Sequence, residues 1–139
     1  MGLFSFKWWI VPICVVFSMI NGSVYYNPKT LFSPWWKIVG AGKEQPGSGN
    51  MAGVWIATII AAVVKAIFFG VAVNAFGSIL GEVSVANGLL TAVLLTGILA
   101  PAYLVNKMFA GHGVKVWAIE VGNHLIDFLA FGVLFGLLK

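Results

Sequence analysis

The long uncharged stretches of this chain constrain its fold more than any other feature. Four occur within 139 residues, at residues 8–26, 51–81, 83–106 and 116–138, and Lys65, Glu120 and Asp127 are the charged residues inside them. A helix needs about 20 apolar residues to cross a bilayer, where lipid offers the backbone no hydrogen-bond partner. Each stretch is long enough. The sequence therefore predicts an all-α, polytopic membrane bundle of four transmembrane helices.

The scarcity of charge argues against a soluble protein. Only 9% of the residues are charged and 60% are hydrophobic, whereas soluble domains carry about 25% charged residues. The net charge of +4 comes from scattered lysines without any arginine. Phosphate contacts require clustered cations, so nucleic-acid binding is excluded. The single cysteine, Cys14, lies in an apolar run and is interpreted as a packed or lipid-facing hydrophobe.

The chain is expected to form one domain over residues 1–139, with spans at about 8–26, 54–76, 86–105 and 116–138. The first span could be mistaken for a signal peptide. Its apolar run is longer than a typical h-region, and no A-x-A-like cleavage site follows, so we expect it to be retained.

Lysine distribution predicts the orientation. The two connections on one side of the bundle hold five lysines: Lys29, Lys37, Lys43, Lys107 and Lys115. The opposite side has Lys7 and Lys139, with Glu82 between the second and third spans. The positive-inside rule then predicts that both termini face the non-cytoplasmic side of a membrane whose identity stays open.

Aromatic residues are concentrated around the end of the first span. The expected interfacial aromatics are Tyr25, Tyr26, Trp35, Trp36 and Trp117. Such rings favour the headgroup region, since they are apolar but carry an N–H or O–H group. The pattern predicts a turn at Asn27-Pro28, a short amphipathic segment, and a polar loop over residues 40–50. An aromatic cage for a ligand is the less common alternative.

The same region resembles a known family. The run Tyr25-Tyr26-Asn27-Pro28, with Leu31-Phe32 and Trp35-Trp36-Lys37 after it, is similar to the uncharacterised membrane family called domain of unknown function 1761. Ile98-Leu99-Ala100-Pro101 and Asn123-His124-Leu125-Ile126 extend the resemblance over nearly the whole chain. Many members have a Trp-Tyr pair where this chain has Tyr25-Tyr26. The resemblance implies a four-span fold and carries no activity or catalytic residue.

Ionisable residues inside the predicted spans are the main candidates for function. Glu120, His124 and Asp127 follow a helical spacing and form one stripe of the fourth span. Lys65 lies near the centre of the second span. Counted from the expected entry points of their spans, Lys65 and Asp127 are equally deep, at about 16 Å, and should form an ion pair.

Other polar residues are expected near this stripe. Ser18 and Asn21 on the first span, and Thr96 on the third, should lie level with Glu120 and His124. We call these seven residues the polar cluster: Lys65, Glu120, His124, Asp127, Ser18, Asn21 and Thr96. The cluster has two interpretations. It is a clasp that fixes helix packing, or it is a proton or ion relay, because histidine titrates near neutral pH.

Small residues support the clasp. Gly77-x-x-x-Gly81 and Gly132-x-x-x-Gly136 are expected to allow close helix packing, and Gly88 and Gly97 add further small positions.

No motif for catalysis or metal binding is present. His112 is the only other histidine and is expected in a solvated loop, so a metal site lacks ligands. The sequence therefore predicts no catalytic residue, no metal and no evident cofactor, and it leaves a bound lipid or pigment open.

Two functional classes remain. The first is an accessory or structural subunit of a larger membrane complex, with energy-converting complexes as one setting. Its partners would be lipid, other membrane subunits or further copies of the chain. The second is a small oligomeric transporter or channel that uses the polar cluster.

Overall fold

The computed structural model describes residues 2–41 and 51–139, which form five helices. In chain order these are α1 (Ile10–Tyr25), α2 (Phe32–Val39), α3 (Ala52–Leu80), α4 (Val85–Phe109) and α5 (Gly113–Leu137). No strand occurs within the two described ranges. The all-α fold class predicted from the sequence is therefore confirmed for these residues.

Three of the helices, α3, α4 and α5, are long and apolar enough to cross a membrane. They cover the predicted spans at 54–76, 86–105 and 116–138 almost completely and extend beyond most of their ends. Helix α1 is apolar but has only 16 residues. Pro12 lies in its first turn, where the missing amide hydrogen breaks no helical bond, and the helix begins at Ile10 rather than Trp8.

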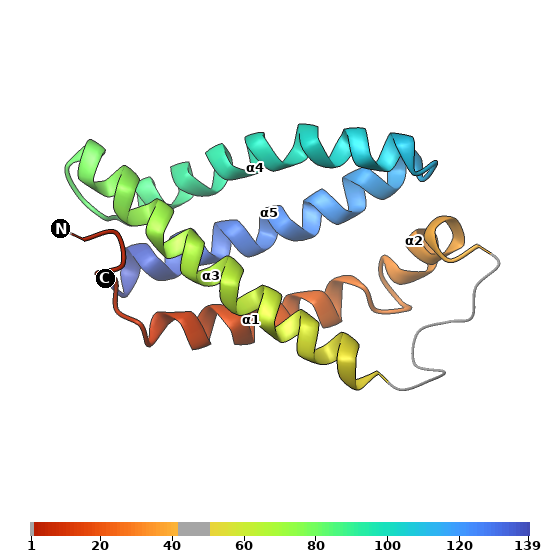
Figure 1. Ribbon diagram of the computed structural model, residues 1–139, viewed down its shortest axis with the longest axis horizontal. Helices are drawn as coiled ribbons and strands as arrows, with labels where there is room; N and C mark the ends of the chain where they lie inside the picture. The colour runs from red at the N-terminus through yellow and green to blue at the C-terminus, as the bar shows by residue number, and fades with distance from the viewer. Residues whose placement is uncertain (1, 42–50) are drawn as a thin grey trace.

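The helices form a bundle whose two termini lie at the same end (Figure 1). Helix α1 runs away from this end, and α3 crosses α1 as it returns towards it. Helices α4 and α5 form a long antiparallel hairpin. Helix α2 lies at the opposite end, beside the connection between α4 and α5. We call that end the α2 end and the other the terminal end.

The turns of the bundle depend on glycines with positive φ. Gly81 ends α3 at a φ of 99°, and Gly111 and Gly113 bracket the α4–α5 turn at 78° and 82°. Residues with a Cβ avoid this left-handed region. The Ser84 side chain then caps α4 by accepting a hydrogen bond from the Asn87 amide.

The segment between α1 and α2 is a compact turn. The Asn27 side chain accepts a hydrogen bond from the Lys29 amide, and the Thr30 hydroxyl donates to the Val24 carbonyl at the end of α1. Helix α2 follows as the predicted short segment. The predicted polar loop over residues 40–50 falls mostly on residues 42–50, which lie outside the described residues.

Phenylalanines fill the core in the terminal half of the bundle. The ring centroids of Phe69 and Phe131 are 5.7 Å apart, and those of Phe69 and Phe135 are 6.2 Å apart. All three side chains are buried, and Cys14 is buried with them as a packed hydrophobe. Phe69 and Phe131 each lie one helical turn beyond Lys65 and Asp127, on the terminal side.

Candidate functional site

Asp127 on α5 is the centre of the polar cluster. Its Oδ2 accepts hydrogen bonds from the Lys65 ammonium at 2.5 Å and from the Ser18 hydroxyl at 2.7 Å. Its Oδ1 accepts one from the Asn21 amide at 2.9 Å. Asp127 is only 1% exposed, so these three bonds replace the water that its carboxylate loses.

The ion pair joins α3 and α5, whose charged residues were expected at equal depth in the membrane. Lys65 on α3 and Asp127 on α5 meet near the middle of the bundle, and the Lys65 ammonium also lies 5.8 Å from the Phe131 ring centroid. A single carboxylate thus connects α1, α3 and α5. Such an arrangement fixes how the three helices pack.

Ser18 and Asn21 contact a different partner from the one expected. They were placed level with Glu120 and His124, but both bond Asp127, and Asn21 also donates to the Asn123 side chain at 2.9 Å. Asn21 thus lies beside the neighbour of His124, near its expected level, whereas Ser18 bonds a residue deeper in α5 than expected, because α5 extends past the end of α1. The Tyr25 hydroxyl donates to the Ile119 carbonyl at 2.6 Å, so the end of α1 is already level with the interior of α5.

Glu120 pairs with a residue that sequence reasoning missed. Its Oε2 lies 2.7 Å from the Lys107 ammonium on α4. The signal was present in the sequence, since the α4–α5 connection is only a few residues long and forces antiparallel neighbours. Lys107, in the last turn of α4, and Glu120, about two turns into α5, face each other across the hairpin.

His124 and Thr96 are not part of the Asp127 network. The His124 Nε2 lies 3.4 Å from the Tyr103 hydroxyl on α4, a partner that the sequence did not suggest. The Thr96 hydroxyl donates to the Ala92 carbonyl of its own helix. The Thr96 hydroxyl therefore bonds its own helix rather than another member of the polar cluster, because a helical threonine readily reaches the carbonyl one turn back.

A cavity of about 660 Å³ lies beside the ion pair, between α1, α2, α3 and α5. Lys65, His124 and Asp127 line one end of it, and Tyr26 and Trp35 are among the aromatic residues that line the other. Its volume is in the range of small-molecule sites. This cavity and the polar groups at its inner end form the candidate site.

The predicted interfacial aromatics gather at the α2 end. Ring centroids are 5.2 Å apart for Tyr25 and Tyr26, 5.2 Å for Tyr26 and Trp35, and 5.9 Å for Trp35 and Trp36. Trp117 is separate and donates its indole N–H to the Ala100 carbonyl at 2.8 Å. It connects α5 to α4 beside Pro101.

Only one of the two predicted glycine motifs mediates helix packing. A Cβ on Gly132 would collide with the Gly88 carbonyl on α4, and a Cβ on Gly136 would lie 2.5 Å from the Val85 nitrogen. Gly77 instead makes room for Val83 in the α3–α4 turn, and Gly81 forms that turn with nothing near it. The packing prediction for Gly77 and Gly81 was wrong, because the second glycine ends the helix.

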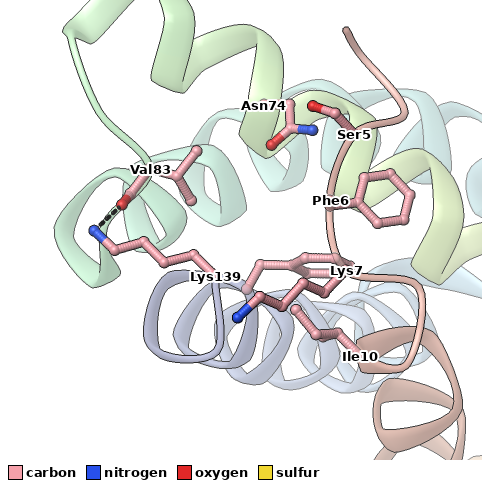
Figure 2. Close-up of a pocket in the computed structure, with 8 residues that line it drawn as sticks. Ser5, Phe6, Lys7, Ile10, Asn74, Val83 and Lys139 are labelled. Carbon is pink, nitrogen blue, oxygen red and sulfur yellow. Dashed lines mark hydrogen bonds between the residues drawn. The ribbon is translucent and has the colours of Figure 1, made fainter. Parts of the chain in front are cut away.

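A second, smaller cavity of about 300 Å³ lies at the terminal end (Figure 2). Lys7 and Lys139, from opposite ends of the chain, both line it, and the Lys139 ammonium donates to the Val83 carbonyl at 2.6 Å. The Asn74 amide donates to the Leu3 carbonyl at 3.0 Å. These two bonds fasten both ends of the described chain to α3 and its turn.

The described part of the chain contains no cluster of side chains suited to a metal ion. Within residues 2–41 and 51–139, no group of three or more His, Cys, Asp or Glu side chains is placed to hold a metal ion.

A family model described as "Protein of unknown function (DUF1761)" matches residues 9–136. The chain belongs to this family. The match confirms the resemblance that the Tyr25-Tyr26-Asn27-Pro28 region suggested. No curated protein and no solved structure matches the chain. The description of the DUF1761 family assigns no activity.

Proposed function

We propose that this DUF1761 chain is a non-enzymatic, multi-pass membrane subunit that packs within a larger membrane protein assembly. In this role the polar cluster is an internal clasp, and the outer surface contacts lipid and neighbouring proteins. An energy-converting complex is one setting for such a subunit.

The observation that carries this proposal is that the charged and histidine side chains inside the helices end halfway through the bundle. Glu120, His124 and Asp127 run from the α2 end to the middle, where Lys65 meets them. Beyond that point the core is dominated by the buried rings of Phe69, Phe131 and Phe135, and its buried polar residues, Asn74 and Thr91, carry no charge. A relay needs titratable groups or water across the full thickness of a membrane. Packed phenylalanine rings provide neither.

The pairing of the charges also supports a clasp. Asp127 pairs with Lys65, and Glu120 pairs with Lys107, each across two helices. Helices in lipid lack a hydrophobic driving force for association, so polar contacts and close packing of small residues hold them together. The Asp127 carboxylate is held in place by three donors from two other helices, as a structural group would be.

The proposal includes α1 as a fourth span. At 16 residues it is about 24 Å long, shorter than the hydrocarbon core of about 30 Å. Trp8 and Trp9 precede it and Tyr26 follows, so aromatic residues flank it at both levels expected for the two membrane surfaces. A shorter span is accommodated by local thinning of the bilayer.

The outer faces of the helices suit lipid or another membrane protein. Large apolar side chains are exposed along α3, as at Ile56, Ile60 and Phe68, and along α4, as at Val93 and Ile98. Contacts through these faces to other subunits or to further copies of the chain would complete the assembly.

A proton-flux assay tests the proposal. The chain is reconstituted in vesicles containing a pH-sensitive dye, as wild type and as Glu120→Gln and His124→Asn, which keep hydrogen-bonding groups of similar size. We expect no flux above empty vesicles from any of them. The native chain, solubilised in mild detergent, should migrate in a larger assembly, and so should both variants.

The cavity beside the ion pair supports a second candidate, a small oligomeric transporter. It reaches Lys65 and Asp127 from the α2 end, and neighbouring copies could supply the rest of a path. A pH-dependent proton flux in wild-type vesicles that Glu120→Gln abolishes would establish the transporter and overturn the proposal of a subunit role.

The proposed topology places both termini on the non-cytoplasmic side. Exposed Ser33 on α2 and exposed Glu82 in the α3–α4 turn lie at opposite ends of the bundle. In a Cys14→Ala background, Ser33→Cys and Glu82→Cys should therefore react with an impermeant thiol reagent from opposite sides. Reaction of both from the same side would refute the orientation and the span count together.

A further inference from the structure

The cavity between α1, α2, α3 and α5 has a shape and a polarity that point to a particular kind of ligand. It occupies about 660 Å³ and follows one face of α3 from Val54 to Lys65. That distance along the helix is about 16 Å. An elongated molecule fits such a space better than a compact ion.

The inner end of the cavity offers hydrogen-bond donors. Both carboxylate oxygens of Asp127 already accept bonds, and Asp127 is 1% exposed, while the Lys65 side chain is 21% exposed. An ammonium has three N–H groups, and Asp127 occupies one of them. The remaining groups of Lys65 are therefore what the inner end presents to a ligand.

The inner end carries no net charge. The Lys65 ammonium is neutralised by Asp127 at 2.5 Å, so a buried anion would gain little from it and would still lose its own hydration. A neutral acceptor, such as a carbonyl oxygen, can take an N–H of Lys65 without that cost. His124 lines the same end, and its buried Nδ1 makes no hydrogen bond to any residue that the structure describes.

The rest of the lining is small or aromatic. Gly22 on α1 and Ala61 on α3 leave the space open, and a Cβ built on Gly22 would meet nothing within 4 Å. Tyr26, Trp35 and Trp55 line the part of the cavity near α2. Flat apolar walls of this kind pack against hydrocarbon and rings.

The phenylalanine core lies on the terminal side of the ion pair, next to the inner end of the cavity. Phe69 and Phe131 pack 5.7 Å apart, centroid to centroid, one turn beyond the ion pair.

We propose that this cavity binds a neutral, lipid-soluble carbonyl compound of the quinone or ketone class. Its carbonyl oxygen accepts a hydrogen bond from the Lys65 ammonium, and its apolar body lies along α3 towards Tyr26, Trp35 and Trp55. The inference does not depend on the proposed function, because a subunit or a transporter could hold such a ligand.

Quenching of tryptophan fluorescence tests the inference, since Trp35 and Trp55 line the cavity. The probe is a benzoquinone with a decyl chain, titrated into the full chain in detergent micelles. We expect saturable quenching in the wild type. Gly22→Phe fills the cavity and should raise the Kd at least about tenfold.

Gly97→Phe is the matched control. Gly97 also lies within a helix with nothing within 4 Å of a built Cβ, but on α4, away from the cavity. Its Kd should equal that of the wild type. Ala61→Phe fills the cavity from the opposite wall and replaces Gly22→Phe if that variant loses its helical circular dichroism.

Two competitors separate the proposed ligand class from other occupants. Decylbenzene lacks the carbonyl and should fail to displace the quinone at equal concentration, and dodecanoate should fail because it is an anion. The inference is overturned if quenching never saturates, or if the cavity-filling variants bind like Gly97→Phe. Equal displacement by decylbenzene would assign the cavity to hydrocarbon chains, and displacement by dodecanoate would assign it to fatty acids.

Discussion

The two sides of α5 pack by different physical means. Towards α4, the backbones touch: Gly132 faces the Gly88 carbonyl, and Gly136 faces the backbone at Ser84 and Val85. Towards α1 and α3, the Asp127 carboxylate of α5 accepts hydrogen bonds from three donors on those two helices, and a cavity of about 660 Å³ remains beside them.

The difference shows how helices in this chain associate without a hydrophobic driving force. Where both helices have glycine, close approach brings dispersion contacts over the whole interface. Where long polar side chains bridge the helices, the backbones stay apart and space remains. The side of α5 that faces α4, which we call the glycine side, is therefore suited to rigidity. The side that faces α1 and α3, which we call the polar side, is suited to a binding site.

The largest expected effect comes from breaking the ion pair on the polar side. Asp127→Leu leaves the partly buried Lys65 ammonium without its carboxylate partner, which should lower the free energy of unfolding by up to about 3–5 kcal/mol. Lys65→Met combined with Asp127→Leu removes both charges and should be more stable than Asp127→Leu alone. Unfolding in mixed micelles of rising dodecyl sulfate content, followed by circular dichroism, measures the difference. A double variant no more stable than the single one would contradict the pairing.

The second prediction concerns a substitution that disrupts the close backbone contact on the glycine side. Gly132→Leu forces a side chain into the Gly88 carbonyl and should cost about 1–3 kcal/mol by overpacking. Gly97→Leu is the control, because a Cβ there meets nothing within 4 Å. The same unfolding measurement compares the two. Equal stability of both variants would show that close backbone contact is not what holds α4 against α5.

The smallest expected effect comes from removing a single hydrogen bond on the polar side. Asn21→Ala removes one donor to Asp127 and should cost about 0.6–1.7 kcal/mol, the size measured for single polar contacts between membrane helices. The matched control is Ser23→Ala, because the Ser23 hydroxyl donates to the Met19 carbonyl of its own helix. An equal loss in Ser23→Ala would mean that the bond to Asp127 adds nothing.

The sequence by itself determined the type of the long elements and the positions of three of them. Charge-free runs of the length of a bilayer leave a helix as the only structure that satisfies its own backbone, and the long helices α3, α4 and α5 follow those runs. It also determined the Lys65–Asp127 pair, because two opposite charges at equal depth inside apolar helices have few other partners.

Only the tertiary structure decided the relative heights of the helices. The end of α1 is level with Ile119 rather than with the start of α5, so Ser18 and Asn21 reach Asp127, and Glu120 is left to pair with Lys107. A sequence fixes position along each helix, but the vertical offset between two helices depends on their turns and side-chain packing. The cavity beside Lys65 results from that offset and from the small residues on α1 and α3, and these come together only when the chain is folded.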